Sequence, residues 1–201
     1  MSSDIQSTFI EAAAIDADGI STAAAVGEDA SLVIGGALAS GGSVTFDQPR
    51  NVTILSAGDD SGISFTVTGT DETGDSATES ITGANAGTAT GSSYFTTVTA
   101  IAAVGDPAGN VSAGSGTAIA APMFRGRMRL RGIYVVNTGT AGTTTFRQTS
   151  SSGAIGMKFN TVASANTTQY PDVPDDGILF AGGGYVLYTQ TTLSSITVFY
   201  S

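Results

Sequence analysis

The sequence predicts an all-β protein made of two small antiparallel domains, each a β-sandwich or barrel-like, with a short N-terminal arm. Apolar and polar residues alternate with a period of two, most clearly where Ile63, Phe65 and Val67 are separated by Ser64 and Thr66. Such runs are short, and turn clusters rich in Gly, Asp, Asn and Ser separate them. At Ala121-Pro122 an acidic part of the chain gives way to a mildly basic one.

Residues 1–30 form the expected arm, and two interpretations of it stay open. Ile5, Phe9 and Ala12 fall roughly on one face of a short helix over residues 5–14. That face is narrow, so an extended arm lying on a neighbouring subunit fits equally well. The first four residues, Met-Ser-Ser-Asp, lack the basic and apolar regions of a secretion signal, and we expect none.

Residues 31–121 form the expected acidic β-sandwich domain, with seven or eight short strands. Asp47-Gln48-Pro49-Arg50 is expected to be a turn, as are Asp71-Glu72-Thr73-Gly74-Asp75 and Asp106-Pro107-Ala108-Gly109. The strands are expected at residues 32–34, 44–46, 51–55, 63–68, 76–82, 94–104, around 111 and at 117–120.

Residues 122–201 form the expected second antiparallel β domain, with about six strands. After a first strand that contains a row of arginines, the expected strands cover residues 143–148, 155–159, 178–180, 185–189 and 196–200. Pro171, Pro174 and Asp175-Asp176-Gly177 break the chain in the middle of this domain.

The row consists of Arg125, Arg127, Arg129 and Arg131, which occupy alternate positions. In one strand all four side chains would share a face, where they repel one another unless solvent or an acidic surface faces them. Residues 1–121 carry fourteen acidic residues and one basic residue, a net charge of −13. Residues 122–201 carry three acidic and six basic residues, a net charge of +3. We therefore predict that the row is an interface to a neighbouring copy or another acidic protein; arginines extended over a solvated sheet face are the alternative.

Glu79 has the same strand parity as Ala77 and Ile81, so its side chain should point toward the apolar side of its strand. A carboxylate there requires a partner, and Arg50 is the only cation before residue 122. We predict an internal Arg50–Glu79 pair. The alternative is an inward-facing charge on an edge strand, which discourages wrong strand pairing.

The composition argues against most kinds of catalysis and metal binding. The chain has no His and no Cys, which excludes Ser-His-Asp and Cys-His catalysis and thiolate metal sites. Most carboxylates occur in glycine-rich turns that they would stabilise, so we expect no enzyme and no cofactor. Calcium is an alternative, but Asp59-Asp60 and Asp71–Asp75 should lie at opposite ends of one strand and could share an ion only between subunits. A sequence pI near 4.1 argues against nucleic acid, and no apolar run is long enough to span a membrane.

Several segments resemble one that recurs in virion structural proteins of tailed bacteriophages. They are Pro49–Ile54, Ser56–Asp71, Thr78–Gly83, Thr96–Ile101 and Gly109–Ser112, within a similar region of about residues 18–116. Residues 132–200 resemble phage head and fibre proteins in style. The resemblance implies a particle component, made in the host cytoplasm and located in the virion, with no catalytic residue.

These expectations combine into a capsid decoration (cement) protein whose partners are other copies of itself and the major capsid or other virion proteins. The resemblance alone implies a threefold assembly, because capsids offer threefold sites to such proteins. A tail, fibre or head-to-tail connecting component is the alternative of the same kind. A host-surface carbohydrate-binding module is an alternative of another kind. Against it, Trp is absent, and the tyrosines at positions 94, 134, 170, 185, 188 and 200 form no evident stacking platform.

Overall fold

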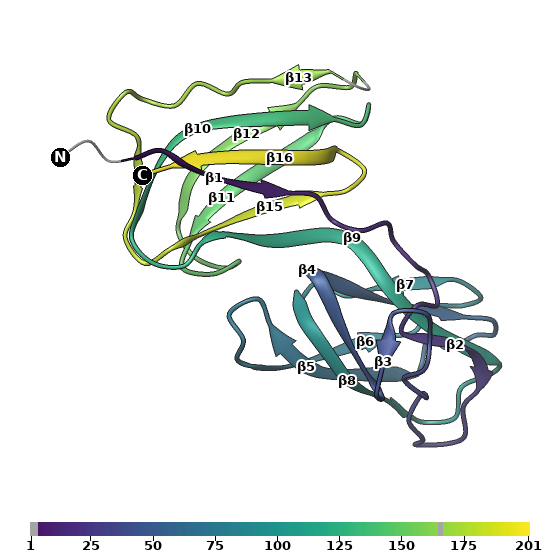
Figure 1. Ribbon diagram of the computed structural model, residues 1–201. Helices are drawn as coiled ribbons and strands as arrows, with labels where there is room; N and C mark the ends of the chain where they lie inside the picture. The colour runs from purple at the N-terminus through teal and green to yellow at the C-terminus, as the bar shows by residue number, and fades with distance from the viewer. Residues whose placement is uncertain (1–3, 165–166) are drawn as a thin grey trace. The chain divides into compact units, whose positions relative to one another are not determined.

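The computed structural model describes residues 4–164 and 167–201, and all the regular structure in these residues is β-strand. This confirms the predicted all-β class, and the strand pairings are antiparallel. The chain divides into two compact units. We call residues 14–117 the middle unit and residues 1–13 with 118–201 the terminal unit, since the latter contains both ends of the chain (Figure 1).

The middle unit is built from a path of five hydrogen-bonded strands in the order β9-β4-β8-β5-β6. The short strands β2, β3 and β7 pair with β9, β4 and β4 respectively. Its strands are β2 (Ser21–Ala25), β3 (Ala39–Ser40), β4 (Ser43–Ser56), β5 (Ser64–Asp71), β6 (Ser76–Thr82), β7 (Thr88–Thr90), β8 (Phe95–Val104) and the first part of β9 (Asn110–Phe124). One face of these strands is buried, and Phe65, Val67, Val98 and Ile101 lie in a common core. The irregular pairing of β8 with β5 at Thr68 and Gly69 puts Val98 and Ile101 on the same side.

The terminal unit is a β-sandwich. Its first sheet has the order β1-β16-β10-β13, with β14 also paired to β10, and its second layer is β12-β11-β15 with the end of β9. Its own strands are β1 (Gln6–Ile10), β10 (Met128–Asn137), β11 (Gly142–Gln148), β12 (Ile155–Thr161), β13 (Thr168–Gln169), β14 (Ile178–Phe180), β15 (Gly184–Thr189) and β16 (Leu193–Tyr200). Both layers contribute side chains to one core, including Ile133 and Val198 from the first and Phe146 and Val186 from the second.

The unit boundaries differ from the expected domains. Residues 4–13 belong to the terminal unit and residues 14–30 to the middle unit, while residues 1–3 of the expected arm lie outside the described part of the chain. The change between units falls between Thr117 and Ala118, inside β9, rather than at Ala121-Pro122.

The helix considered for residues 5–14 is wrong. Residues 6–10 form β1, which pairs with β16 from Gln6 opposite Tyr200 to Ile10 opposite Ile196. Ile5 and Phe9, spaced like neighbours on a helix, are instead both exposed, and Ile10 is buried. Pairing along the edge of a sheet satisfies the backbone of a segment whose apolar face is too narrow for a docked helix.

The turn expected at Asp47-Gln48-Pro49-Arg50 is also wrong, because β4 continues through it. The pairing of β4 with β8 is irregular between Thr45 and Arg50. A proline has no N–H to donate to a ladder and is tolerated in a strand at such irregularities. Pro49 therefore lies within a strand without ending it.

Candidate interaction surface

The arginine row begins in a turn rather than in a strand. β9 ends at Phe124, β10 begins at Met128, and Arg125 and Arg127 are exposed in the turn between them. Gly126 has a φ of +116°, a conformation that glycine adopts readily and other residues avoid. The prediction that all four arginines share one strand face is therefore wrong, since only Arg129 and Arg131 belong to a strand.

Arg129 and Arg131 extend from β10 on the side opposite the buried Met128 and Leu130. Arg129 Nη1 donates a hydrogen bond to the carbonyl oxygen of Asp176 at 3.0 Å, and Arg131 Nη1 donates one to the carbonyl oxygen of Asp175 at 3.0 Å. Arg131 Nε also donates to Ser201 Oγ at 2.9 Å. These two half-buried side chains thus hold the loop before β14 and the end of the chain against β10.

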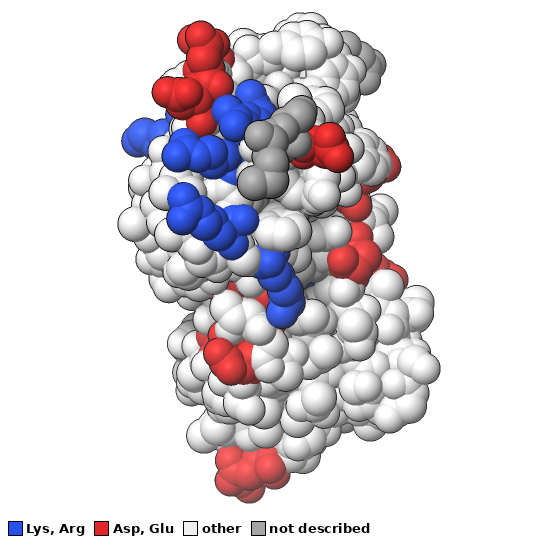
Figure 2. All heavy atoms as spheres, turned by 60° about the vertical axis from the view of Figure 1, so that its left-hand side comes forward, with Lys and Arg blue, Asp and Glu red and all other residues white. Residues whose placement is uncertain are grey.

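None of the four guanidinium groups lies within 4.0 Å of a carboxylate oxygen of the described chain. The chain nevertheless carries seventeen acidic residues. Basic side chains gather on one face of the surface, with acidic ones beside some of them (Figure 2). Two exposed apolar side chains adjoin the arginines: Phe124 precedes Arg125, and Leu179 pairs with Arg129 across the sheet. The four arginines, which we call the arginine group, therefore keep their charge available for another molecule.

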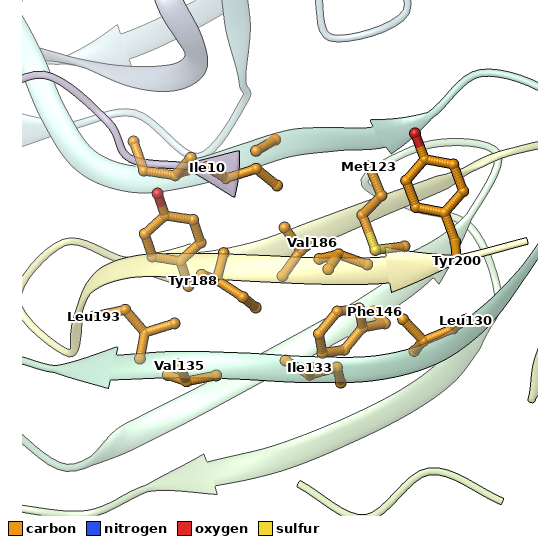
Figure 3. Close-up of a cluster of buried hydrophobic side chains, with 14 of the residues drawn as sticks. Ile10, Met123, Leu130, Ile133, Val135, Phe146, Val186, Tyr188, Leu193 and Tyr200 are labelled. Carbon is orange, nitrogen blue, oxygen red and sulfur yellow. The ribbon is translucent and has the colours of Figure 1, made fainter. Parts of the chain in front are cut away.

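The outward side of the first sheet carries aromatic rings. Leu130, Ile133 and Val135 of β10 and Tyr200 of β16 point into the core (Figure 3), and the residues between them point outward. The irregular pairing of β10 between Leu130 and Gly132 lets Leu130 and Ile133 share a side. We call the outward residues Phe9, Tyr134, Tyr170 and Phe199 the aromatic face. Phe9 is 61% exposed, Phe199 37% and Tyr170 73%.

Two tyrosines of this face meet, although the sequence showed no such cluster. The ring centroids of Tyr134 and Tyr170 lie 5.2 Å apart with an interplanar angle of 52°, a favourable tilted arrangement. Tyr170 directly follows β13, and β13 pairs with β10 at Val135, beside Tyr134. The contact depends on the pairing of strands more than thirty residues apart, so spacing along the sequence could not reveal it.

The predicted Arg50–Glu79 pair is wrong. Arg50 is buried, its Nη2 lies 2.7 Å from Asp47 Oδ1, and its guanidinium carbon lies 5.6 Å from the centre of the Phe46 ring. On a regular strand, residues three apart point to opposite faces. The irregularity of β4 between Thr45 and Arg50 provides the change of direction that lets Asp47 reach Arg50.

Glu79 has the predicted parity and is half-buried, but its partners are backbone and hydroxyl groups. Its Oε1 accepts hydrogen bonds from the amide of Ser92 at 2.6 Å, the hydroxyl of Ser92 at 2.8 Å and the amide of Ser93 at 3.1 Å. Glu79 thus fixes the loop that connects β7 to β8. One of its carboxylate oxygens is satisfied by N–H and O–H donors in place of a cation, while the buried Oε2 accepts no hydrogen bond within the described chain.

The acidic turns stabilise themselves. Asp71 Oδ1 accepts hydrogen bonds from the amides of Thr73, Gly74 and Asp75 at 2.8–3.0 Å and from the hydroxyl of Thr73 at 2.7 Å. Burial raises the pKa of Asp71, but these hydrogen bonds together outweigh it and leave the pKa lowered. Hydrogen bonds from the side chain and amide of Ser61 likewise lower the pKa of Asp59. No group of three or more acidic side chains in the described ranges is placed to hold a metal ion.

A shallow hollow of about 280 Å³ lies beside the aromatic face. It is lined by Phe159, Asn160, Gln169, Tyr170 and Pro171, which come from β12, β13 and the segment after β13. No pattern in the sequence indicates this site, because its lining comes from two segments joined only by the fold.

Residues 4–164 and 167–201 include no helix with the length and apolar character needed to cross a membrane. No family model, curated protein or solved structure significantly matches this chain.

Proposed function

We propose that this protein is a non-enzymatic structural component of a bacteriophage particle, a decoration protein that binds and stabilises the capsid shell. The observation that carries the proposal is the arginine group: four cations within seven residues, without a carboxylate partner in the described chain, on a molecule of net charge −10. The resemblance of residues 18–116 to virion structural proteins supports the same function.

The chemistry of the surface suits a protein partner. Arginine and aromatic residues are enriched in the centres of protein interfaces, and both occur on the terminal unit, in the arginine group and the aromatic face. An exposed arginine contributes little electrostatic free energy to an ion pair while water surrounds it. When a partner excludes that water, the attraction to a facing carboxylate strengthens.

The distribution of charge favours an acidic partner, such as shell protein or another copy. The middle unit has twelve acidic residues and Arg50, a net charge of −11, and the terminal unit has five acidic and six basic residues, a net charge of +1. The arginine group of one copy is therefore attracted to the middle unit of another, as well as to acidic surface on the shell.

Arg125→Ser/Arg127→Ser tests the proposal best, because these two side chains are exposed and donate no hydrogen bond within the described chain. Arg129 and Arg131 are less suitable, since they also hold a loop. We expect the double variant to bind shells that lack this protein at least about tenfold more weakly, a loss of about 1.4 kcal/mol. Bound copies per shell would be measured after incubation and sedimentation.

Lys158→Ser provides the control, because it removes an exposed cation from β12, away from the arginine group in the sequence. Its binding should equal that of the wild type, and all three proteins should melt alike. If the double variant binds shells normally, the arginine group is not the contact surface.

A further inference from the structure

The hollow beside the aromatic face combines apolar rings with amide groups. Phe159, Tyr170 and Pro171 form its apolar walls, and Asn160 and Gln169 supply the polar groups. No lining residue is charged. Its volume of about 280 Å³ lies just below the usual range for ligand sites, which suits one ring-sized group.

Tyr170 offers an exposed ring held from one side. Its side chain is 73% exposed, and the ring of Tyr134 packs against it at 5.2 Å. An isolated exposed tyrosine would lose rotational freedom when a ligand stacks on it, whereas this ring already has a packed neighbour. The exposed ring can therefore receive a flat apolar surface at low entropic cost.

The two amides have unused hydrogen-bonding capacity. Gln169 Oε1 is buried and accepts no hydrogen bond within the described chain, while Nε2 makes a long contact of 3.5 Å to the carbonyl oxygen of Asn160. Asn160 Oδ1 accepts a hydrogen bond from Thr143 Oγ1 at 3.0 Å, which leaves Nδ2 as a donor. A buried acceptor without a donor is costly. Because the Nε2 contact is long, the Gln169 amide can turn and bring Oε1 into the hollow, where the hydroxyl group of a ligand would donate to it.

We propose that this hollow binds a neutral carbohydrate, with the apolar face of a sugar ring stacked on Tyr170 and its hydroxyl groups bonded to Gln169 and Asn160. A sugar ring presents C–H groups on its face and hydroxyl groups around its edge, which matches aromatic walls with amides between them. The uncharged lining favours a neutral sugar over an acidic one. This activity is independent of shell binding and would let the same protein contact glycans.

A proline-rich peptide is the competing ligand, because aromatic grooves also receive such chains. Proline has no N–H, so a proline-rich segment brings mainly carbonyl acceptors. The unsatisfied atom here is itself an acceptor, Gln169 Oε1. A sugar hydroxyl can donate to it, which is why the carbohydrate fits better.

The test uses the full-length protein on an array of neutral hexose and N-acetylhexosamine oligosaccharides, with a proline-rich peptide array beside it. The best-bound oligosaccharide is then titrated by calorimetry. We expect Tyr170→Ala to weaken binding about tenfold or more, the scale for loss of an aromatic anchor. Gln169→Leu removes the acceptor and should weaken binding similarly, whereas Gln169→Glu keeps an acceptor and Tyr170→Phe keeps a ring, so both should still bind.

Phe9→Ala is the matched control, since it removes another largely exposed ring, one that does not line the hollow. It should leave the affinity for sugar unchanged. The proposal is overturned if the wild type binds no neutral glycan, if Tyr170→Ala and Gln169→Leu bind as well as the wild type, or if only the peptide array gives binding that depends on Tyr170. Because no shell protein is present, none of these outcomes depends on the decoration role.

Discussion

At the scale of single residues, polar side chains in this protein mostly stabilise the backbone that surrounds them. Asp71 and Glu79 each accept several hydrogen bonds at one oxygen from a nearby loop. Such bonds to an ionised carboxylate are stronger than those to a neutral acceptor. The stability of the Asp71 turn therefore depends on the charge of its carboxylate, and so on pH.

Asp71→Asn tests this dependence. The lowered pKa of Asp71 means that its ionised form stabilises the fold above the pKa of the unfolded chain, near 3.9, and that this contribution is lost as pH falls through the folded pKa. Asparagine keeps an acceptor oxygen but has no charge. We expect the variant to melt below the wild type at pH 6, and the difference to shrink as pH falls below about 4. Thermal melts followed by circular dichroism measure it; a difference that stays constant with pH would contradict the assignment.

The direction in which a side chain points could be predicted from the sequence, whereas the group to which it bonds could not. The alternation of Ala77, Glu79 and Ile81 correctly placed Glu79 on the inner side of β6, because strand parity is a local property. Its hydrogen-bond donors come from Ser92 and Ser93, beyond the next strand. Arg50 contacts the carboxylate of Asp47, three residues away, only because β4 is irregular between Thr45 and Arg50. Neither partner follows from residue type and charge alone.

At the scale of elements, strands bounded by strong turn signals were predicted well. β6 (Ser76–Thr82) and β14 (Ile178–Phe180) have the predicted bounds, and β5, β8, β11, β12 and β15 differ by a few residues at most. The strand expected at residues 32–34 is wrong, because only an isolated bridge at Ser31 forms there. Two further errors occur where pairing overrides local composition. β4 passes through Pro49, and β1 forms where Ile5 and Phe9 suggested a helix. In both segments a neighbouring strand supplies the hydrogen bonds that decide the structure.

Gly126 is a local signal, present in the sequence, that the arginine row does not form one continuous strand. A single glycine inside a strand pattern often marks an interruption, and here it allows the turn between β9 and β10. The sequence therefore indicated which arginines lie close together, but the predicted geometry of one strand face is wrong. Their role as an interface stays a prediction. Two of the arginines are on a turn and two on a strand.

Gly126→Ala should destabilise this turn, because a side chain is strained at a φ of +116°. We expect a loss of about 1–2 kcal/mol, seen as faster hydrogen exchange of amides at the end of β9 and the start of β10. Gly62→Ala is the control: it also lies in a loop, without a positive φ and with open space around it, and should exchange like the wild type. Equal protection in Gly126→Ala would show that the turn imposes no such requirement.

At the scale of the whole molecule, charge is divided between the units. The middle unit carries −11 and the terminal unit +1, and the four arginines of the terminal unit lack carboxylate partners in the described chain. Each unit has its own apolar core, so neither core depends on this charge. The separation of charge therefore adds little to folding and is better suited to association between molecules.

This separation predicts that copies associate through salt-sensitive contacts. A cationic group on one copy and an acidic unit on the next attract over a distance set by the Debye length, about 10 Å in 0.1 M salt and about 3 Å in 1 M salt. We expect sedimentation velocity to detect oligomers of the purified protein in low salt and fewer in about 1 M salt. Arg125→Glu/Arg127→Glu should give monomer in both conditions, because reversed charge turns the attraction into repulsion.

Lys158→Glu separates a specific contact from a general effect of net charge. It adds negative charge in the same way as each of the two arginine reversals, but at a cation outside the arginine group. If the arginine group makes the contact, Lys158→Glu should still form oligomers in low salt. Loss of association in Lys158→Glu to the same extent would mean that overall charge governs self-association. If the oligomers instead persist equally in low and high salt, the contact would lie on the aromatic face, because burial of apolar surface does not weaken as salt rises.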